Sequence, residues 1–134
     1  MRLLSAVILI AALALTVGAC GEGRNAVTGT ITFDGDPAIP PGAVLTVELR
    51  DVSYQDAPSE LISSQTIESP ERFPIDFAVH YDPDEIDPRA TYGVQIRITR
   101  NDQLIYINDT AFDVLTRGNS SHGVHTWVIA VGGG

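Results

Sequence analysis

The sequence predicts an all-β domain, a sandwich of about seven strands, that follows an N-terminal export signal. From residue 26 onward, short runs alternate between apolar and polar residues, with turn-forming residues between the runs. This alternation is typical of strands that bury one face. No segment of this region repeats its apolar residues with the helical period of about 3.6. The length of 134 residues fits one domain.

Residues 1–19 have the layout of an export signal. Arg2 gives a positive start, residues 3–17 form an uncharged and almost wholly apolar run, and small residues follow. Signal peptides have these three parts in this order. The run is shorter than the roughly 20 residues that span a bilayer comfortably, which makes a mature transmembrane helix the weaker alternative. We expect residues 1–19 to be removed on export.

Residues 17–20, with the sequence Val-Gly-Ala-Cys, resemble the bacterial lipobox, in which an aliphatic and two small residues precede an obligatory Cys. The Cys thiol takes a diacylglyceryl group before the bond between Ala19 and Cys20 is cleaved. Cys20 is therefore the expected lipid-modified first residue, and its acyl chains anchor it at about 0.8 kcal/mol per buried methylene. An incidental buried thiol is the alternative. Cys20 is the only Cys, so the mature protein has no disulfide.

Residues 20–25 are expected to form a short lipidated tether. Gly21 stands where Asp tends to retain a lipoprotein in the inner membrane, so it favours the outer membrane, facing the periplasm. The net charge is −9, and all 8 basic residues are Arg. Such a charge argues against nucleic acid as a partner and against electrostatic attachment to anionic lipid. The N-terminal lipid is the expected contact with the membrane.

The domain proper is predicted to span residues 26–131. Residues 27–33 place their apolar side chains on one face and threonines on the other. In residues 43–52 the odd-numbered positions from Leu45 onward form the core face. Residues 60–68 are rich in Ser and have few large side chains, which predicts an edge strand.

The second half of the domain continues the alternation. Residues 73–79 place their odd-numbered apolar residues on one large face, and residues 91–100 place Tyr92 and the even-numbered residues inward. Asn101-Asp102 is a tight turn that predicts a hairpin. The remaining expected segments are the second hairpin strand 103–108, a short apolar piece 112–115, a loop 117–123, the last strand 124–131 and a flexible tail 132–134.

Ile86, Pro88 and Tyr92 precede a strand with the spacing of a tyrosine corner. In immunoglobulin-like and fibronectin-like sandwiches, the hydroxyl of this Tyr bonds backward to the backbone. The bond supplies partners for backbone groups where the chain changes sheets. These residues therefore favour a sandwich of that type and a structural role for Tyr92. An ordinary core Tyr after a Pro turn is the alternative.

Carboxylates and histidines give weak signals for metal. Residues 82–87 contain four carboxylates, and Ca²⁺ prefers such oxygen ligands. The spacing is not that of an EF-hand, and Pro83 and Pro88 stiffen the segment, so a solvated acidic loop is preferred over a calcium site. His122 and His125 would face opposite ways on a strand, and no Cys is available to join them. We expect no metal ion and no cofactor.

Catalytic motifs are also missing from the sequence. It has no Gly-x-Ser-x-Gly elbow, no ordered triad and no glycine-rich phosphate loop. We therefore expect no enzyme and no catalytic residues. Trp127 lies in a last strand with two apolar faces, so it is either packed core or part of a surface patch for a partner.

Four stretches of the mature chain form a pattern that is specific as a set. They are Val27-Thr28-Gly29-Thr30-Ile31, Pro41-Gly42-Ala43-x-Leu45-x-Val47-x-Leu49-x-Asp51-Val52-Ser53, Phe73-Pro74-Ile75-x-Phe77 and Tyr81-Asp82-x-x-x-Ile86-x-Pro88-x-x-x-Tyr92. Together they resemble the YbaY/YscW-type lipoproteins, a family that includes type III secretion pilotins. The resemblance implies an outer-membrane lipoprotein with a β-sandwich. It also implies a type of partner, since pilotins bind the C-terminal segment of a secretin and carry it to the outer membrane.

The leading hypothesis is a non-enzymatic cell-envelope lipoprotein that binds or helps to assemble a secretin or another envelope protein. An extended partner segment would add to the edge of the strand that contains Ser63 and Ser64, or lie in an apolar groove. Two alternatives stay open. One is a structural or stress-related envelope lipoprotein without a dedicated partner, and the other is a β-domain that binds calcium or a small ligand.

Overall fold

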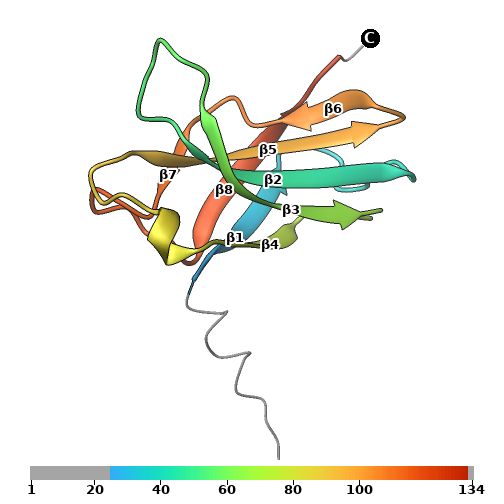
Figure 1. Cartoon of the computed structure of the whole chain (residues 1–134). Helices are drawn as coiled ribbons and strands as arrows, with labels where there is room; N and C mark the ends of the chain where they lie inside the picture. Colours follow the sequence, from blue (N-terminus) through green and yellow to red (C-terminus); the bar gives the residue numbers. More distant parts are fainter. Residues whose placement is uncertain (1–24, 133–134) are drawn as a thin grey trace, which may run out of the picture.

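The computed structural model describes residues 25–132, which fold into one curled sheet of eight strands (Figure 1). The expected signal 1–19, its cleavage site and residues 133–134 lie outside the described residues, and of the tether 20–25 only Asn25 is described. Within 25–132 there is no helix long and apolar enough to cross a membrane. The elements are β1 (Ala26–Phe33), β2 (Ala43–Asp51), β3 (Glu60–Glu68), β4 (Ile75–His80), the 3-10 helix η1 (Pro83–Glu85), β5 (Tyr92–Arg100), β6 (Gln103–Ile107), β7 (Phe112–Val114) and β8 (Val124–Ala130).

The strands follow one another around the sheet in the order β3-β2-β5-β6-β8-β1-β4, and β7 pairs with β5 off this path. β8 joins the two parts of this path: residues 124–128 pair in parallel with β1, and Ile129 and Ala130 pair antiparallel with β6. A sandwich has two separate sheets, whereas here all the strands belong to one continuous sheet. The prediction of an immunoglobulin-like sandwich is therefore wrong, and the fold is a nearly closed, barrel-like sheet. The all-β prediction is confirmed. Alternation of period 2 shows which side of a strand is buried, but it does not distinguish two facing sheets from one curled sheet.

The core lies inside the curl of the sheet. Leu45, Val47 and Leu49 of β2 and Ile96 of β5 have no exposed surface, so the faces expected for these strands are confirmed. At the end of the sheet where β1 finishes, the rings of Phe33, Phe73 and Tyr106 contact one another with centroids 5.0 to 5.4 Å apart. Aromatic pairs of this kind contribute about 0.5–1.5 kcal/mol each beyond their burial.

The turn between β5 and β6 is the predicted hairpin. Asn101 and Asp102 have φ angles of 53° and 65°, and Arg100 pairs with Gln103. Positive φ at both central residues matches the right-handed twist of the flanking strands, and Asn and Asp tolerate it better than most residues. The expected tight turn is therefore confirmed.

The sheet is not closed by a strand ladder between β3 and β4, which are the two ends of the path. The prediction that residues 60–68 form an edge strand is thus confirmed. Side chains of β3 bridge the two edges instead. The Ser63 hydroxyl donates to the His80 carbonyl, and the side-chain oxygen of Gln65 accepts a hydrogen bond of 2.9 Å from the Ala78 N–H. We call this contact the β3–β4 seam.

The chain enters the sheet beside the end of β4. The Tyr81 N–H donates to the Asn25 carbonyl at 2.9 Å, and Ala26 pairs with His80. The segment that follows Tyr81 contains η1 and then leads into β5. The start of β1 and the acidic segment 82–87 therefore lie at the same end of the sheet, which Figure 1 shows.

Candidate functional site

An open groove of about 390 Å³ lies over the ends of β2 and β5 and against the loop between β6 and β7. β2 provides Arg50, and Val52 follows that strand. β5 provides Gly93 and its neighbours. Residues 108–111, with the start of β7, form the facing wall. The register of β2 and β5 places Arg50 directly beside Gly93, so two segments far apart in the sequence form one floor.

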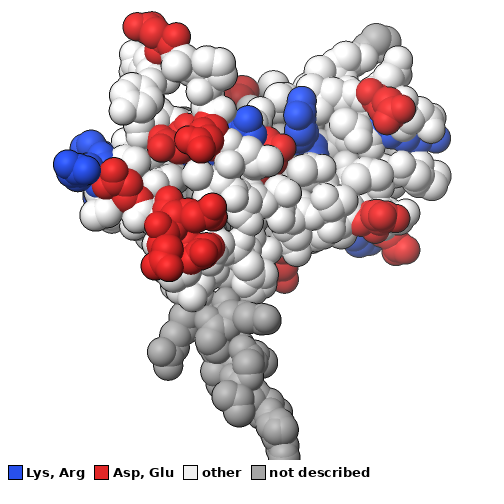
Figure 2. Space-filling model, viewed as in Figure 1, with Lys and Arg blue, Asp and Glu red and all other residues white. Residues whose placement is uncertain are grey.

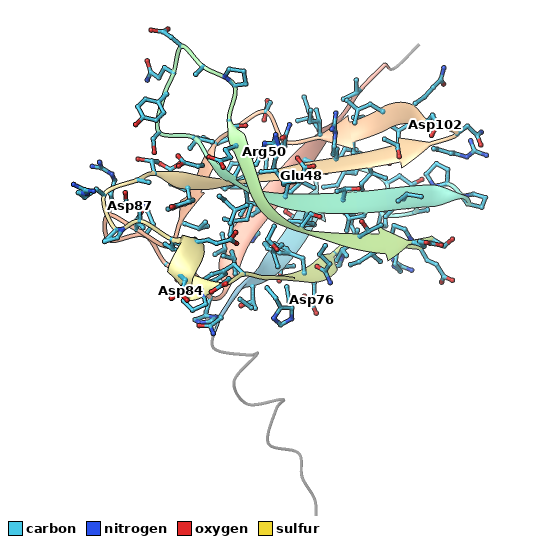
Figure 3. All side chains as sticks on the ribbon, viewed as in Figure 1. Glu48, Arg50, Asp76, Asp84, Asp87 and Asp102 are labelled. Atoms are coloured by element: carbon cyan, nitrogen blue, oxygen red, sulfur yellow. The ribbon has the colours of Figure 1, made fainter. Side chains whose placement is uncertain are left out.

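Arg50 is held firmly on the side of this groove. Its Nη1 atom lies 3.1 Å from Oε1 of Glu48, and both side chains are mostly buried, with 23% and 17% of their surface exposed. Its Nε donates to the Ser59 hydroxyl at 2.7 Å. Figure 3 shows Arg50 and Glu48 next to each other on β2. Because Glu48 balances the charge of Arg50 at close range, Arg50 adds little net positive charge to the groove.

Asn108 fixes the loop that forms the wall. Its side-chain oxygen accepts a hydrogen bond of 2.7 Å from the Ile96 N–H. Its side-chain nitrogen donates to the Thr110 carbonyl at 2.9 Å and to the Val94 carbonyl at 3.4 Å. Asn108 thus supplies hydrogen bonds to β5 between the end of β6 and the start of β7, and these bonds fix the position of the wall.

The family model described as type III secretion system lipoprotein chaperone (YscW) matches residues 22–125. The chain belongs to the YscW family. The resemblance seen in the sequence is therefore confirmed. The match covers nearly all of the described sheet and the groove, and it ends just after the start of β8.

Two relatives of this YscW-family chain are informative. The uncharacterized lipoprotein YbaY of Escherichia coli K12 is 35% identical over 95 residues, which cover 70% of this chain and 50% of YbaY, so the chain spans about half the length of this curated relative. The structure of an alternative pilotin from the type II secretion system of Vibrio cholerae superposes with a TM-score of 0.75 and 34% identity. That similarity covers 81% of this chain and 97% of the pilotin chain. The matched descriptions name lipoproteins, a chaperone and a pilotin.

The corner residues of this YscW-family chain lie in the connection from β4 to β5. The Tyr92 hydroxyl accepts a hydrogen bond of 2.8 Å from the Asp87 N–H and donates to the Glu85 carbonyl at 3.5 Å. Its ring is buried, with 1% of the residue exposed. Ile86 packs against the core, whereas Pro88 is exposed. Tyr92 therefore bonds backward to the loop although the sheet is not a sandwich.

The acidic segment 82–87 uses carboxylates within its own turns. Asp82 caps η1 by accepting a bond of 2.9 Å from the Asp84 N–H. Asp87 accepts a bond of 2.9 Å from the Arg89 N–H, and this bond is the main reason why the pKa of Asp87 lies below its ordinary value of 3.8. In residues 25–132, no three His, Cys, Asp or Glu side chains are grouped so that they could hold a metal ion.

His122 and His125 have different neighbours, and only His125 has a ring contact with Trp127 among the described residues. The Nδ1 atom of His122 lies 3.4 Å from the Thr28 hydroxyl. The ring of His125 lies 6.0 Å from that of Trp127, and the Trp127 ring packs edge-on against Phe112 at 4.8 Å. With 40% of its surface exposed, Trp127 is neither fully core nor fully surface. Its ring contact with Phe112 links β8 to β7, two strands that do not pair with each other.

The groove was not predicted from the sequence. Arg50, Gly93 and Asn108 come from three separate segments, and only the register of β2, β5 and β6 brings them together. One signal was present, because a Gly within an alternating strand often marks a close approach by another group. Ala19 and Cys20, the expected cleavage and lipidation residues, lie outside the described residues.

Proposed function

We propose that this protein is a non-enzymatic, lipid-anchored envelope lipoprotein that binds another envelope protein as a pilotin does. The observation that carries the proposal is the similarity to the Vibrio cholerae pilotin, which covers 97% of that chain at 34% identity. The YscW family description, a secretion-system lipoprotein chaperone, supports the same role. The C-terminal segment of a secretin is the first candidate for the bound partner.

The proposal includes the anchor. In it, the chain is cleaved between Ala19 and Cys20, and Cys20 carries the lipid. Two or more acyl chains hold a protein on a membrane far longer than one, so an anchored domain can bring a bound subunit to the outer membrane. Gly21 supports the outer membrane as the destination, facing the periplasm.

Affinity purification from mildly solubilised envelopes tests both parts of this proposal. We expect the wild-type protein to recover a secretin from the outer membrane. Cys20→Ser cannot be lipidated, and we expect it to recover no secretin from that membrane. Mass spectrometry of the purified mature protein reports the acyl chains on Cys20. Recovery of no outer-membrane protein with the lipidated form would overturn the proposal and favour a structural or stress-related lipoprotein without a dedicated partner.

The edge of β3 is a less favourable place for a partner than the sequence suggests. Ser63 and Gln65 already bridge this edge to β4. A partner strand that enters the β3–β4 seam must first break these bonds. The groove over β2 and β5 requires no such rearrangement, which supports the groove as the binding surface.

A further inference from the structure

The floor of the groove contains a glycine that the packing of the protein does not require. A Cβ atom on Gly93 would lie 3.7 Å from the Phe112 carbonyl oxygen and 3.7 Å from the nearest methyl of Val52, which are ordinary contacts. By contrast, a Cβ on Gly29 of β1 would lie 2.1 Å from the Val124 carbonyl oxygen, so packing imposes Gly29. A Gly within a strand weakens the strand, and at Gly93 no internal contact explains this weakening.

The groove has uncompensated negative charge on the wall opposite Arg50. Asp109 and Asp113 line it, and both are exposed. In residues 25–132, ion pairs join Arg50 to Glu48 and Arg89 to Asp87, and neither pair includes these two aspartates. Because Glu48 balances Arg50, the remaining charge of the lining is negative. A cationic group on a partner is therefore the complementary one.

Apolar surface lies next to this charge. Val52 has 38% of its surface exposed, and Leu61, which pairs with Arg50 across β2 and β3, has 49% exposed. Ala111 lines the other side of the groove. Figure 2 shows side chains of both charges over β2 and β5 and a larger group of acidic side chains over η1. Apolar surface beside carboxylates fits a segment that has an apolar side and a basic side.

We propose that this groove binds an amphipathic segment of a partner protein. An apolar side chain of the segment lies over Gly93 between Val52 and Ala111, and a Lys or Arg of the segment pairs with Asp109 and Asp113. The inference rests on the proposed function, since it states where the partner binds and with what chemistry. Because Gly93 has no side chain, the bound segment can approach the backbone of β5. Any larger residue at position 93 would fill part of this space.

Peptide binding to the mature lipoprotein in detergent micelles tests the inference. The probe is an amphipathic peptide of leucine and lysine, and its counterpart has glutamate in place of lysine. Backbone NMR signals report the contact surface. We expect the lysine peptide to shift the amide signals of Gly93, Gln95 and Ala111, and the glutamate peptide to bind at least about tenfold more weakly. Shifts confined to the β3–β4 seam or to Trp127 would overturn the inference.

A matched pair of variants separates a local charge effect from the overall acidity of the protein. Asp109→Asn with Asp113→Asn removes two charges at the groove. Asp76→Asn with Asp102→Asn removes two charges from exposed positions on β4 and in the β5–β6 turn, which Figure 3 shows away from Arg50. We expect the groove variant to weaken binding of the lysine peptide about tenfold and the control variant to change it less than about twofold. Equal losses in both variants would overturn the inference.

Gly93→Ala separates a binding role from a structural role. The added methyl has room, and Ala loses less backbone entropy on folding than Gly. We therefore expect an unchanged or higher Tm together with weaker peptide binding, by about threefold or more. A lower Tm with unchanged binding would mean that Gly93 is structural, which is contrary to the inference.

The envelope purification described above distinguishes this inference from the proposed function. If the wild type and the Asp109→Asn, Asp113→Asn variant recover the same secretin equally well, the groove is not the binding surface, although the proposed function holds. If neither recovers an outer-membrane protein while the lysine peptide binds the groove as expected, the proposed function fails and the groove inference stands.

Discussion

Tyr92 has its ring in the core and its hydroxyl in the loop that precedes β5. The ring is shielded from solvent, and the hydroxyl bonds to the Asp87 N–H and the Glu85 carbonyl. The loop contains Pro88, which has no N–H, and it ends where β5 begins. We propose that these two bonds set the path of the loop into β5.

Tyr92→Phe is expected to destabilise the protein by about 1 kcal/mol, because the Asp87 N–H loses its partner while the ring stays packed. In a domain of this size, the change lowers Tm by about 4 °C. Thermal unfolding followed by circular dichroism measures it. Tyr54→Phe is the matched control, since Tyr54 is 76% exposed and should leave Tm unchanged. Equal effects of the two variants would contradict the role assigned to the Tyr92 hydroxyl.

Asp87 is expected to titrate below its ordinary pKa of 3.8, mainly because its carboxylate accepts a bond from the Arg89 N–H. A lowered pKa in the folded state means that the charged form stabilises the fold. This small contribution is present above pH 3.8 and is lost as the pH falls through the folded pKa. NMR titration of the Asp87 carboxyl carbon measures it. In Arg89→Ala the backbone N–H remains, so most of the lowering should persist, and a return to the ordinary value would contradict this cause.

At the scale of elements, the β3–β4 seam shows how an edge is closed without a ladder. Ser63 and Gln65 lie on the inward face of β3, as their pairing with Leu49 and Val47 indicates. Polar side chains at inward positions of an edge strand discourage further strand pairing. Here they also satisfy backbone groups of β4, so the seam is closed by side chains at modest cost to the core.

Gln65→Leu is expected to open the seam locally, because the Ala78 N–H loses its acceptor while the volume of the side chain is kept. Loss of about 1 kcal/mol of local stability corresponds to roughly fivefold faster hydrogen exchange of the Ala78 amide. Exchange measured by NMR reports this directly. Thr66→Val changes the exposed neighbour on the opposite face of β3 and should leave the Ala78 amide unaffected. An unchanged exchange rate in Gln65→Leu would show that the bond does not protect this amide.

At the scale of the whole molecule, the pairing of β8 with both β1 and β6 decides the architecture. Alternation was sufficient to predict the buried faces of β2 and β5 and the Asn101-Asp102 hairpin, since these depend on neighbouring residues. It was not sufficient for the pairing of residue 29 with residue 124, which depends on contacts between distant segments. The groove escaped prediction for the same reason, because Arg50 and Gly93 meet only through the register of β2 and β5.

Because the sheet is continuous, the protein is expected to unfold in one cooperative transition. A sandwich of weakly coupled halves would permit an intermediate, whereas here β8 pairs with both β1 and β6, so main-chain bonds connect all eight strands. Urea unfolding followed by Trp127 fluorescence and by far-UV circular dichroism should give coincident transitions. Distinct midpoints for the two signals would indicate that the segment around β8 unfolds separately from the rest.

The bond between Asn25 and Tyr81 has a consequence for how the domain meets a bilayer. With the lipid proposed for Cys20, the segment up to Asn25 spans at most roughly 18 Å when fully extended. Such a short tether keeps the end of the sheet that contains η1 nearest the lipid headgroups. The carboxylates of segment 82–87 repel an anionic membrane surface. The tether then orients the domain relative to the bilayer, while charge repulsion keeps the domain from lying on the bilayer surface. Under the proposed function, we expect a partner to approach parallel to the membrane plane, with the aromatic end near Phe33 directed away from the bilayer.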